Sequence, residues 1–168
     1  MNKPKSMSGT AATTVTPATA SVTSAHPVVQ YLTKVLADTY VLGVKTHGAH
    51  WNVKGPGFFR LHAAFDEQYH ELLLAADDIA ERIRALGSAA PASMRQLLEQ
   101  SAIGEPPAAD DVQLVRALRD DHRQVAKQCR QATTVAEDAD DKATADLLIG
   151  RSTAHDKTAW MLTATLGE

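Results

Sequence analysis

"HWNVKGPGFFRLHAAFD", residues 50–66, places a tight turn between two stretches of helical character. The Gly-Pro-Gly at its centre resists continuation of a helix, because proline lacks a backbone donor and glycine is conformationally permissive. His50 lies six residues before Pro56, and His62 lies six residues after it. Residues at equal distances from the turn of an antiparallel helical hairpin sit at the same height, so we expect the two imidazoles to converge.

Apolar residues repeat with helical spacing on both sides of this turn. Before it, they recur at intervals of three, four and seven, which predicts a helix from Pro27 to about Val53. After it, they recur every seven residues, which predicts a second helix from near Phe58 to Gly87. The residues that carry the two patterns are Val28, Leu32, Val35, Leu42, Phe65, Leu72, Ile79 and Leu86.

The remaining sequence predicts two more helices after a long connection. Residues 88–109 form the connection and hold one short amphipathic piece, SMRQLLEQ. A third long helix is predicted from about Asp110, whose carboxylate suits a helix N-terminus, and a fourth from Asp140 or Asp141 to the end. No segment reads as a strand. We therefore predict an all-α four-helix bundle with a short helix in the long crossover between helices two and three, because a simple up-down bundle needs only a short link there.

The composition bounds the class of protein. The 168 residues suit one domain, predicted over residues 27–168, and 17 basic against 20 acidic residues give a net charge of −3. This charge excludes a protein that coats nucleic acid with its whole surface. Cys129 is the single cysteine, which excludes an internal disulfide and favours a reducing, cytoplasmic location. No apolar run approaches the roughly 20 residues of a membrane span. Residues 1–26, rich in Ala, Thr, Ser and Pro, are predicted to be a disordered tail.

A stripe of acidic and histidine side chains accompanies the core stripe of the second predicted helix. Asp66 follows His62 by four residues and Glu81 follows Asp77 by four, so each pair shares a helix face. With Phe65 set at zero and about 100° per residue, these four residues lie at about 60° to 160° around the helix. The predicted core residues Leu72, Tyr69 and Ala76 lie within roughly 40° of Phe65. The stripe therefore flanks the core and is not directed at the bundle axis. His50 joins it from the first helix.

His50, His62 and Asp66 form half of a metal site suited to Fe or Zn. The side chains of one chain cannot bring all five candidate ligands to the same metal. Asp66 and Asp77 are separated by about 16 Å along the helix at 1.5 Å per residue, whereas metal–ligand bonds are about 2 Å long. We therefore expect a two-fold dimer with antiparallel second helices, in which His50, His62 and Asp66 of one chain face Asp77 and Glu81 of the other. Zinc and cobalt accept the same ligands, so the pattern does not select iron by itself.

The segment AHWNVKGPGFFRLHAAFDEQYHELLLAADDIAERI resembles the signature of the Dps proteins, the DNA-protection-during-starvation mini-ferritins. The resemblance extends from about residue 28 to the end and includes DDKATADLL. It implies an all-α, ferritin-like bundle that forms a hollow dodecamer, oxidises Fe(II) preferentially with hydrogen peroxide, and stores ferric mineral inside. It also implies a ferroxidase site for two irons between two subunits. The family's ligand positions are filled here by His50, His62, Asp66, Asp77 and Glu81.

Roles are also expected for residues outside this set, for Trp51 from its place next to His50 and for the others from the resemblance. Trp51 is expected beside the site, where an indole would absorb a stray oxidising equivalent; the alternative is interface packing. Asp141 and Asp146 are expected to line an acidic entry pore at a three-fold axis; the alternatives are helix-start charge for Asp141 and a solvated face for Asp146. Family members that bind DNA often use a Lys-rich N-terminal tail, but this tail carries just Lys3 and Lys5, so DNA binding stays open.

Other histidines have simpler interpretations. His122 and His155 lie in apolar stripes and are expected to be packed core histidines, whereas His47 is a candidate for a supporting role near the site. Three classes of function remain: an iron oxidase and store, a DNA-binding protein that compacts the nucleoid, and a structural shell with an inactive site. The complete set of five ligand types favours the first class.

Overall fold

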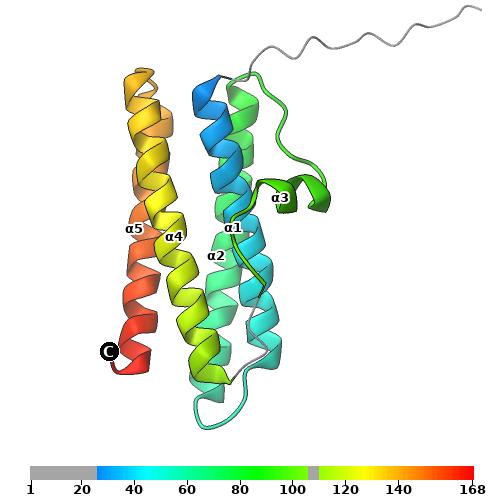
Figure 1. The fold of residues 1–168 in the computed structure, drawn as a ribbon, viewed down its shortest axis with the longest axis vertical. Coiled ribbons are helices and arrows are strands. Elements are labelled where there is room, and N and C mark those ends of the chain that lie inside the picture. Colours follow the sequence, from blue (N-terminus) through cyan, green and yellow to red (C-terminus); the bar gives the residue numbers. More distant parts are fainter. Residues whose placement is uncertain (1–25, 106–109) are drawn as a thin grey trace, which may run out of the picture.

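A computed structural model of the chain describes residues 26–105 and 110–168, and in these ranges it has five helices and no strand (Figure 1). The prediction of an all-α bundle with a short helix in the crossover is confirmed. Residues 1–25, including Lys3 and Lys5, lie outside the described residues. The helices are α1 (Pro27–Asn52), α2 (Phe58–Ala85), α3 (Met94–Gln100), α4 (Asp111–Asp138) and α5 (Lys142–Leu166).

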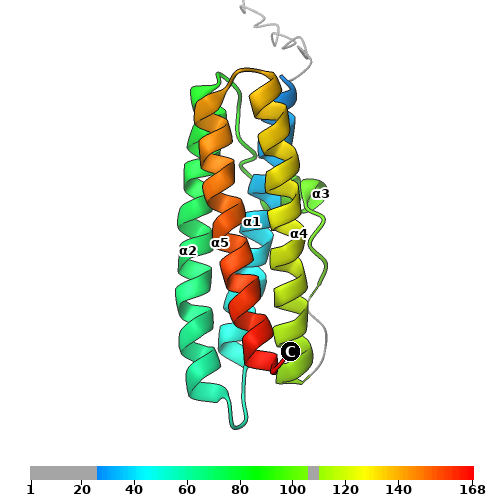
Figure 2. The same ribbon diagram turned by 90° about the vertical axis from the view of Figure 1, so that its left-hand side faces the viewer.

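The four long helices form two antiparallel hairpins that pack together. α1 pairs with α2 and α4 pairs with α5 along their lengths, while α2 and α5 make few contacts with each other (Figure 2). The crossover returns from the end of α2 to the start of α4, and its short helix α3 packs against α1 (Figure 1). None of the helices in the described part of the chain is long and apolar enough to cross a membrane.

Local sequence explains the hairpin of α1 and α2. Pro27 lies in the first turn of α1, where its missing N–H would have no helical partner in any case. α1 ends at Asn52, close to the predicted boundary. Gly55 then adopts a φ of 84°, a conformation that favours glycine, and α2 begins at Phe58 as predicted. The turn therefore places the last turn of α1 beside the first turns of α2.

Side-chain caps define where the later helices begin. The side chains of Ser93, Asp110 and Asp141 each accept a hydrogen bond from the backbone N–H three residues further on, at the starts of α3, α4 and α5. The predicted starts of the third and fourth long helices are thus confirmed. α5 ends at Gly167, whose φ of 75° gives a left-handed C-cap.

Buried polar contacts hold the crossover against α1. The Ser101 hydroxyl and the Ala102 N–H both donate to Asp38 Oδ1, at 2.7 and 2.6 Å. The Lys45 ammonium donates to the Gly104 carbonyl at 2.9 Å. Because Asp38 and Lys45 are both buried, these contacts fix the crossover in place against α1.

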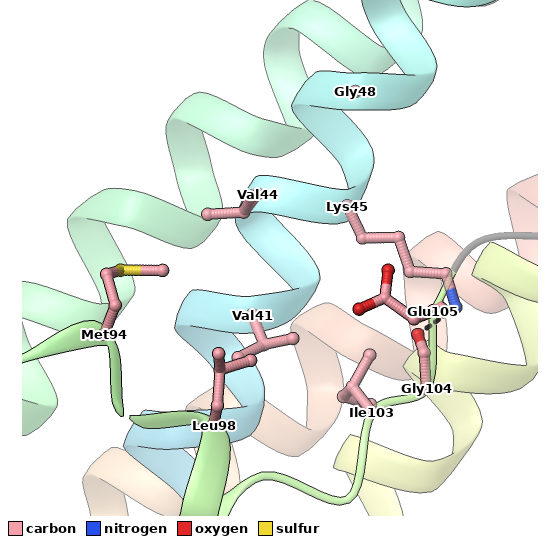
Figure 3. A pocket seen from close by; sticks show the side chains of 9 residues that line it. All are labelled: Val41, Val44, Lys45, Gly48, Met94, Leu98, Ile103, Gly104 and Glu105. Atoms are coloured by element: carbon pink, nitrogen blue, oxygen red, sulfur yellow. Dashed lines mark hydrogen bonds between the residues drawn. The ribbon is translucent and has the colours of Figure 1, made fainter. Parts of the chain in front are cut away.

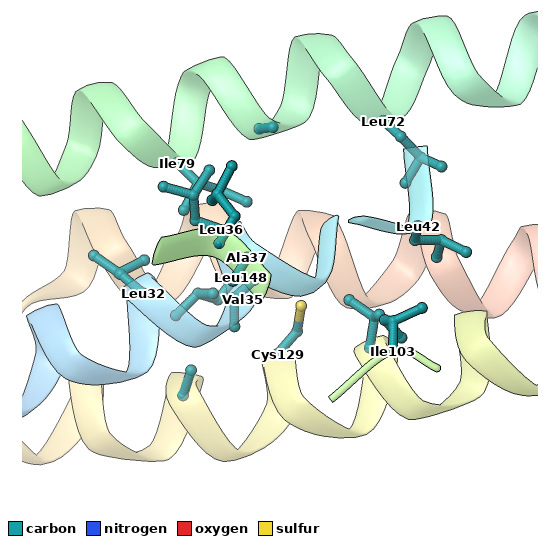
Figure 4. Close-up of a cluster of buried hydrophobic side chains, with 14 of the residues drawn as sticks. Leu32, Val35, Leu36, Ala37, Leu42, Leu72, Ile79, Ile103, Cys129 and Leu148 are labelled. Carbon is teal, nitrogen blue, oxygen red and sulfur yellow. The ribbon is translucent and has the colours of Figure 1, made fainter. Parts of the chain in front are cut away.

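The core is an apolar cluster drawn from all four long helices and closed by the crossover (Figure 4). The predicted core positions Leu72 and Ile79 are fully buried, and His122 and His155 are 2% and 1% exposed, so their prediction as core histidines is confirmed. Cys129 is also fully buried, and burial raises the pKa of its thiol to about 12.

Candidate metal centre

The rings of His50 and His62 stack on each other where α1 ends and α2 begins. Their centroids are 3.8 Å apart and their planes differ by 22°. The prediction that the two imidazoles converge across the turn is confirmed. Phe58 covers the outer side of this pair, because its ring lies 4.9 Å from that of His62.

Backbone hydrogen bonds determine which nitrogen of each ring is free. His50 Nδ1 lies 2.9 Å from the carbonyl oxygen of His62, and His62 Nδ1 lies 2.9 Å from the carbonyl oxygen of His50. A carbonyl accepts hydrogen bonds and does not donate them, so each Nδ1 carries the proton. In the neutral rings both Nε2 atoms therefore keep their lone pairs, which is the form that binds a metal.

The Asp66 carboxylate joins the two histidines in a loose cluster that is too open to hold a metal ion on one chain. Its Oδ1 atom lies 3.9 Å from His50 Nε2. The His50 side chain is 14% exposed and the Asp66 side chain 47% exposed, so the carboxylate end of this cluster lies at the surface. His70, one turn further along α2, donates from Nδ1 to the Asp66 backbone carbonyl at 2.9 Å and is itself exposed.

Asp77 and Glu81 lie on α2 well away from this cluster. Both are exposed, as the helical wheel predicts for residues that flank the core. Within residues 26–105 and 110–168, no three His, Cys, Asp or Glu side chains gather as a site able to hold a metal ion. The five candidate ligands therefore occur as two groups, one of three residues and one of two, on the same side of α2.

A second ring cluster surrounds the histidines, and its central residue was not predicted. Tyr69 stacks on His47 with centroids 3.9 Å apart and lies 5.6 Å from the His50 ring. Trp51 is 66% exposed and its ring contact is with His47, at 4.1 Å. Burial and the neighbouring Asp66 carboxylate raise the pKa of Tyr69. Tyr69 follows Asp66 by three residues, a spacing that puts both side chains on one helix face. This spacing was the sequence signal that Tyr69 lies near the candidate ligand Asp66.

Asp141 and Asp146 lie at the opposite end of α2 from the histidines. Asp141 caps α5 and pairs with Arg82 of α2 at 2.6 Å. Although burial opposes the shift, hydrogen bonds from Thr144 and the Arg82 guanidinium lower the pKa of Asp141. Asp146 is exposed beside Lys142 in a shallow hollow. Asp141 therefore has a structural role within one chain, as the N-cap of α5 and the partner of Arg82.

An apolar groove lies between α1 and α3 (Figure 3). Val44, Met94 and Leu98 line it and are 49%, 49% and 56% exposed. Its volume is about 220 Å³, and Lys45 reaches across one end to the Gly104 carbonyl. This groove offers apolar surface and none of the five candidate ligands.

Comparison with known families and sequences identifies relatives of the whole chain. The family described as ferritin-like domain matches residues 29–168. The chain is 40% identical over 142 residues to DNA protection during starvation protein 2 of Bacillus anthracis, which covers 84% of this chain and 97% of the relative. It is 37% identical over 136 residues to DNA protection during starvation protein of Brevibacillus brevis, which covers 80% of this chain and 91% of the relative.

Solved structures agree with the sequence relatives. The crystal structure of Dps from Staphylococcus aureus matches with a TM-score of 0.81 and 37% identity, over 83% of this chain and 94% of that one. Dps from Listeria innocua soaked with zinc matches with a TM-score of 0.81 and 30% identity, over 84% of this chain and 97% of that one. A further structure of the Listeria innocua protein, soaked with cobalt, has the same TM-score.

Proposed function

This chain belongs to the Dps family of ferritin-like proteins, and from that premise we propose that it oxidises Fe(II) with hydrogen peroxide and stores ferric iron in a hollow dodecamer. Iron storage and protection of DNA are the functions of the family. The proposal extends beyond these family functions to the oxidant, the site residues and the assembly.

The observation that carries the proposal is the orientation of His50 and His62. Their Nδ1 protons are held by backbone carbonyls, so both Nε2 atoms keep their lone pairs, and His50 Nε2 lies 3.9 Å from Asp66 Oδ1. A folded chain that fixes two imidazoles in the ligand tautomer has prepared half of a metal site in advance.

In this proposal, the second half of the metal site comes from Asp77 and Glu81 of a second copy related by two-fold symmetry. His62 and Glu81 lie at equal distances from the peptide bond between Glu71 and Leu72, and so do Asp66 and Asp77. A two-fold axis that crosses α2 at this point brings both pairs into register when a second copy packs antiparallel.

Further residues on this face of α2 fit the same axis. Phe59 and Arg84 are symmetric about it, as are His70 and Leu73. Leu73 and Leu74, which are 36% and 70% exposed, lie near the axis and offer apolar surface for the second copy.

The chemistry of the five residues suits Fe(II) as a substrate. Three carboxylates provide hard oxygen ligands and two imidazoles provide borderline nitrogen ligands. In register, Asp66 faces Asp77 of the partner subunit, and a cation between the two carboxylates removes their repulsion. Each of two Fe(II) ions gives one electron, and these electrons with two protons from solvent convert one peroxide into two waters. No hydroxyl radical is released in that balance.

Two further roles belong to the proposal. Asp146, with Asp141 beside it, lines an acidic path for Fe(II) into the shell; Asp146→Asn should slow iron uptake at low ionic strength more than at high ionic strength. Lys3 and Lys5 lie outside the described residues and are proposed to touch DNA as a solvated arm. A gel shift at low salt with the full chain and with a variant lacking residues 1–26 tests that contact.

The oxidation is tested by adding Fe(II) anaerobically to the purified assembly, then hydrogen peroxide, while ferric absorbance and a hydroxyl-radical trap are followed together. We expect rapid oxidation of about two Fe(II) per peroxide with little trapped radical, as the electron balance requires. A rate equal to that of a protein-free control would refute the proposed activity.

Matched variants test the residues. Asp77→Ala with Glu81→Ala should abolish rapid oxidation, because both ligands of the second group are lost. Asp78→Ala is the control, since Asp78 is an exposed carboxylate next to Asp77 that turns about 100° away from it. Unchanged kinetics in the double variant would support a shell with an inactive site instead.

A further inference from the structure

The Tyr69 ring of α2 lies against α1 beside the candidate metal ligands. It stacks on His47 with centroids 3.9 Å apart and planes that differ by 16°, and the His70 ring lies 4.1 Å from it. The His50 ring lies edge-on to it, 5.6 Å away. Three neighbouring rings therefore restrict the rotation of the Tyr69 side chain, which fixes the direction of its hydroxyl group.

One side chain beside the Asp66 carboxylate is able to donate a hydrogen bond to it. In the described part of the chain, the side chains paired with this carboxylate are those of His50, His70 and Tyr69. Neutral His50 carries its proton on Nδ1, so its Nε2 atom offers a lone pair and no proton. His70 donates its Nδ1 proton to the Asp66 backbone carbonyl at 2.9 Å. The hydrogen bond of the carboxylate with Tyr69 therefore has the phenolic hydroxyl as its donor.

The surroundings of Tyr69 keep its hydroxyl group protonated. Burial raises the pKa of Tyr69 from its ordinary value of 10.0, and the charge and hydrogen bond of Asp66 raise this pKa further. At neutral pH the side chain is thus a hydrogen-bond donor to a ligand, and is not a phenolate that would bind the metal itself.

The distance between Asp66 Oδ1 and His50 Nε2 makes the position of the carboxylate critical. Two atoms that each lie about 2 Å from one metal ion are at most about 4 Å apart, and the observed distance is 3.9 Å. The Asp66 side chain is 47% exposed, so without a donor beside it the carboxylate would be free to turn towards water. A small rotation away from His50 would leave the two atoms too far apart to share a metal ion.

We propose that Tyr69 is a positioning residue of the candidate metal site, whose hydroxyl group holds the Asp66 carboxylate beside His50 Nε2 as an oxygen ligand. A carboxylate that accepts one hydrogen bond keeps further lone pairs for the metal. Loss of a hydrogen-bond partner of a metal ligand typically weakens metal binding about 10- to 100-fold. This inference rests on the proposed metal site and is independent of the oxidant.

Anaerobic titration of the iron-free, assembled full chain with Co(II) tests the proposal. Cobalt accepts the same ligands, and its visible spectrum reports their geometry. Tyr69→Phe removes the hydroxyl group and keeps the ring that stacks on His47. We expect this variant to bind Co(II) about tenfold more weakly, with a changed visible band and an unchanged circular dichroism spectrum. Tyr31→Phe is the control, because it removes the same group from an exposed tyrosine near the start of α1, at the opposite end of that helix from His50.

A double-variant cycle separates an effect through Asp66 from a general loosening of the site. Asp66→Ala removes the group that Tyr69 positions, so adding Tyr69→Phe to it should weaken Co(II) binding no further. An additive loss would overturn the proposal, as would an unchanged affinity and spectrum in Tyr69→Phe alone. If the unchanged chain binds no Co(II), the proposed metal site itself is refuted, and the role of Tyr69 with it.

Discussion

His50 and His62 are oriented by each other's backbone: each ring donates from Nδ1 to the carbonyl oxygen of the other residue. Replacing one histidine therefore removes one ligand and leaves the backbone acceptor that orients the other. We expect His50→Ala and His62→Ala each to weaken anaerobic Fe(II) binding at least tenfold, by a similar factor, with the fold retained.

Calorimetric titration of Fe(II) under anaerobic conditions measures this effect. His26→Ala is the control, because His26 is an exposed histidine at the start of α1, at the opposite end of that helix from His50. An equal loss in His26→Ala would mean that the weaker binding does not come from the loss of a ligand at the turn between α1 and α2.

The proposed two-fold axis predicts which residues of α2 lie close to the same residue of the partner subunit. A Leu73→Cys variant places two thiols about 4.5 Å apart along α2 in the dimer, whereas Arg84→Cys places them about 38 Å apart. We expect a short bis-maleimide to link Leu73→Cys chains into covalent dimers and to leave Arg84→Cys chains mostly unlinked. Denaturing electrophoresis reads the result, and the buried Cys129 contributes little background. Efficient linkage through Arg84→Cys with none through Leu73→Cys would exclude this register.

The buried pair of His122 and His155 predicts acid sensitivity. The folded-state pKa of His122 is lowered to about 3 and that of His155 is lowered in the same direction. Below the ordinary pKa of about 6.5, the two histidines are protonated in the unfolded chain but stay neutral in the folded chain. The free energy of unfolding therefore falls as the pH drops from about 6.5 towards 3. For His122 alone, the free energy of unfolding should be about 2 kcal/mol lower at pH 5 than at pH 7.

Urea unfolding at pH 7 and pH 5 checks this sign. The variant His122→Leu with His155→Leu should lose most of the pH dependence, and the exposed His70→Ala should keep it. A larger stability at pH 5 than at pH 7 for the unchanged chain would contradict the prediction.

The ion pair of Lys45 and Asp121 joins α1 to α4 at 2.6 Å, with both side chains largely buried. Lys45→Met should lower the free energy of unfolding by about 3 kcal/mol, because Asp121 is left as a buried charge without its partner. Combining it with Asp121→Leu should restore part of the loss, as measured by urea unfolding. A double variant less stable than Lys45→Met would show that the pair contributes mainly through other contacts.

Much of the fold follows from short-range signals in the sequence. Pro27, the Gly-Pro-Gly turn and the acidic caps Asp110 and Asp141 act within one turn of helix, so the helix boundaries were predictable. The meeting of His50 with His62 was predictable too, because it depends on distance from one turn.

Other contacts depend on the packing of segments far apart in the chain. Asp38 accepts hydrogen bonds from Ser101 and Ala102, and no periodicity connects these residues. Arg151 reaches Glu71 across the bundle for the same reason. The role of Tyr69 was missed because the wheel assigned it to the core, whereas its ring packs against His47 beside the candidate ligands.

The buried position of Cys129 bears on how the chain would withstand peroxide, the oxidant in the function that we propose. Peroxide oxidises thiolates, and a thiol whose pKa is raised to about 12 holds very little thiolate at neutral pH. Burial in the bundle also keeps the sulfur atom out of reach of solvent. The one thiol in the sequence is therefore protected chemically and sterically, so a chain that meets peroxide repeatedly avoids sulfenic acid damage at this position.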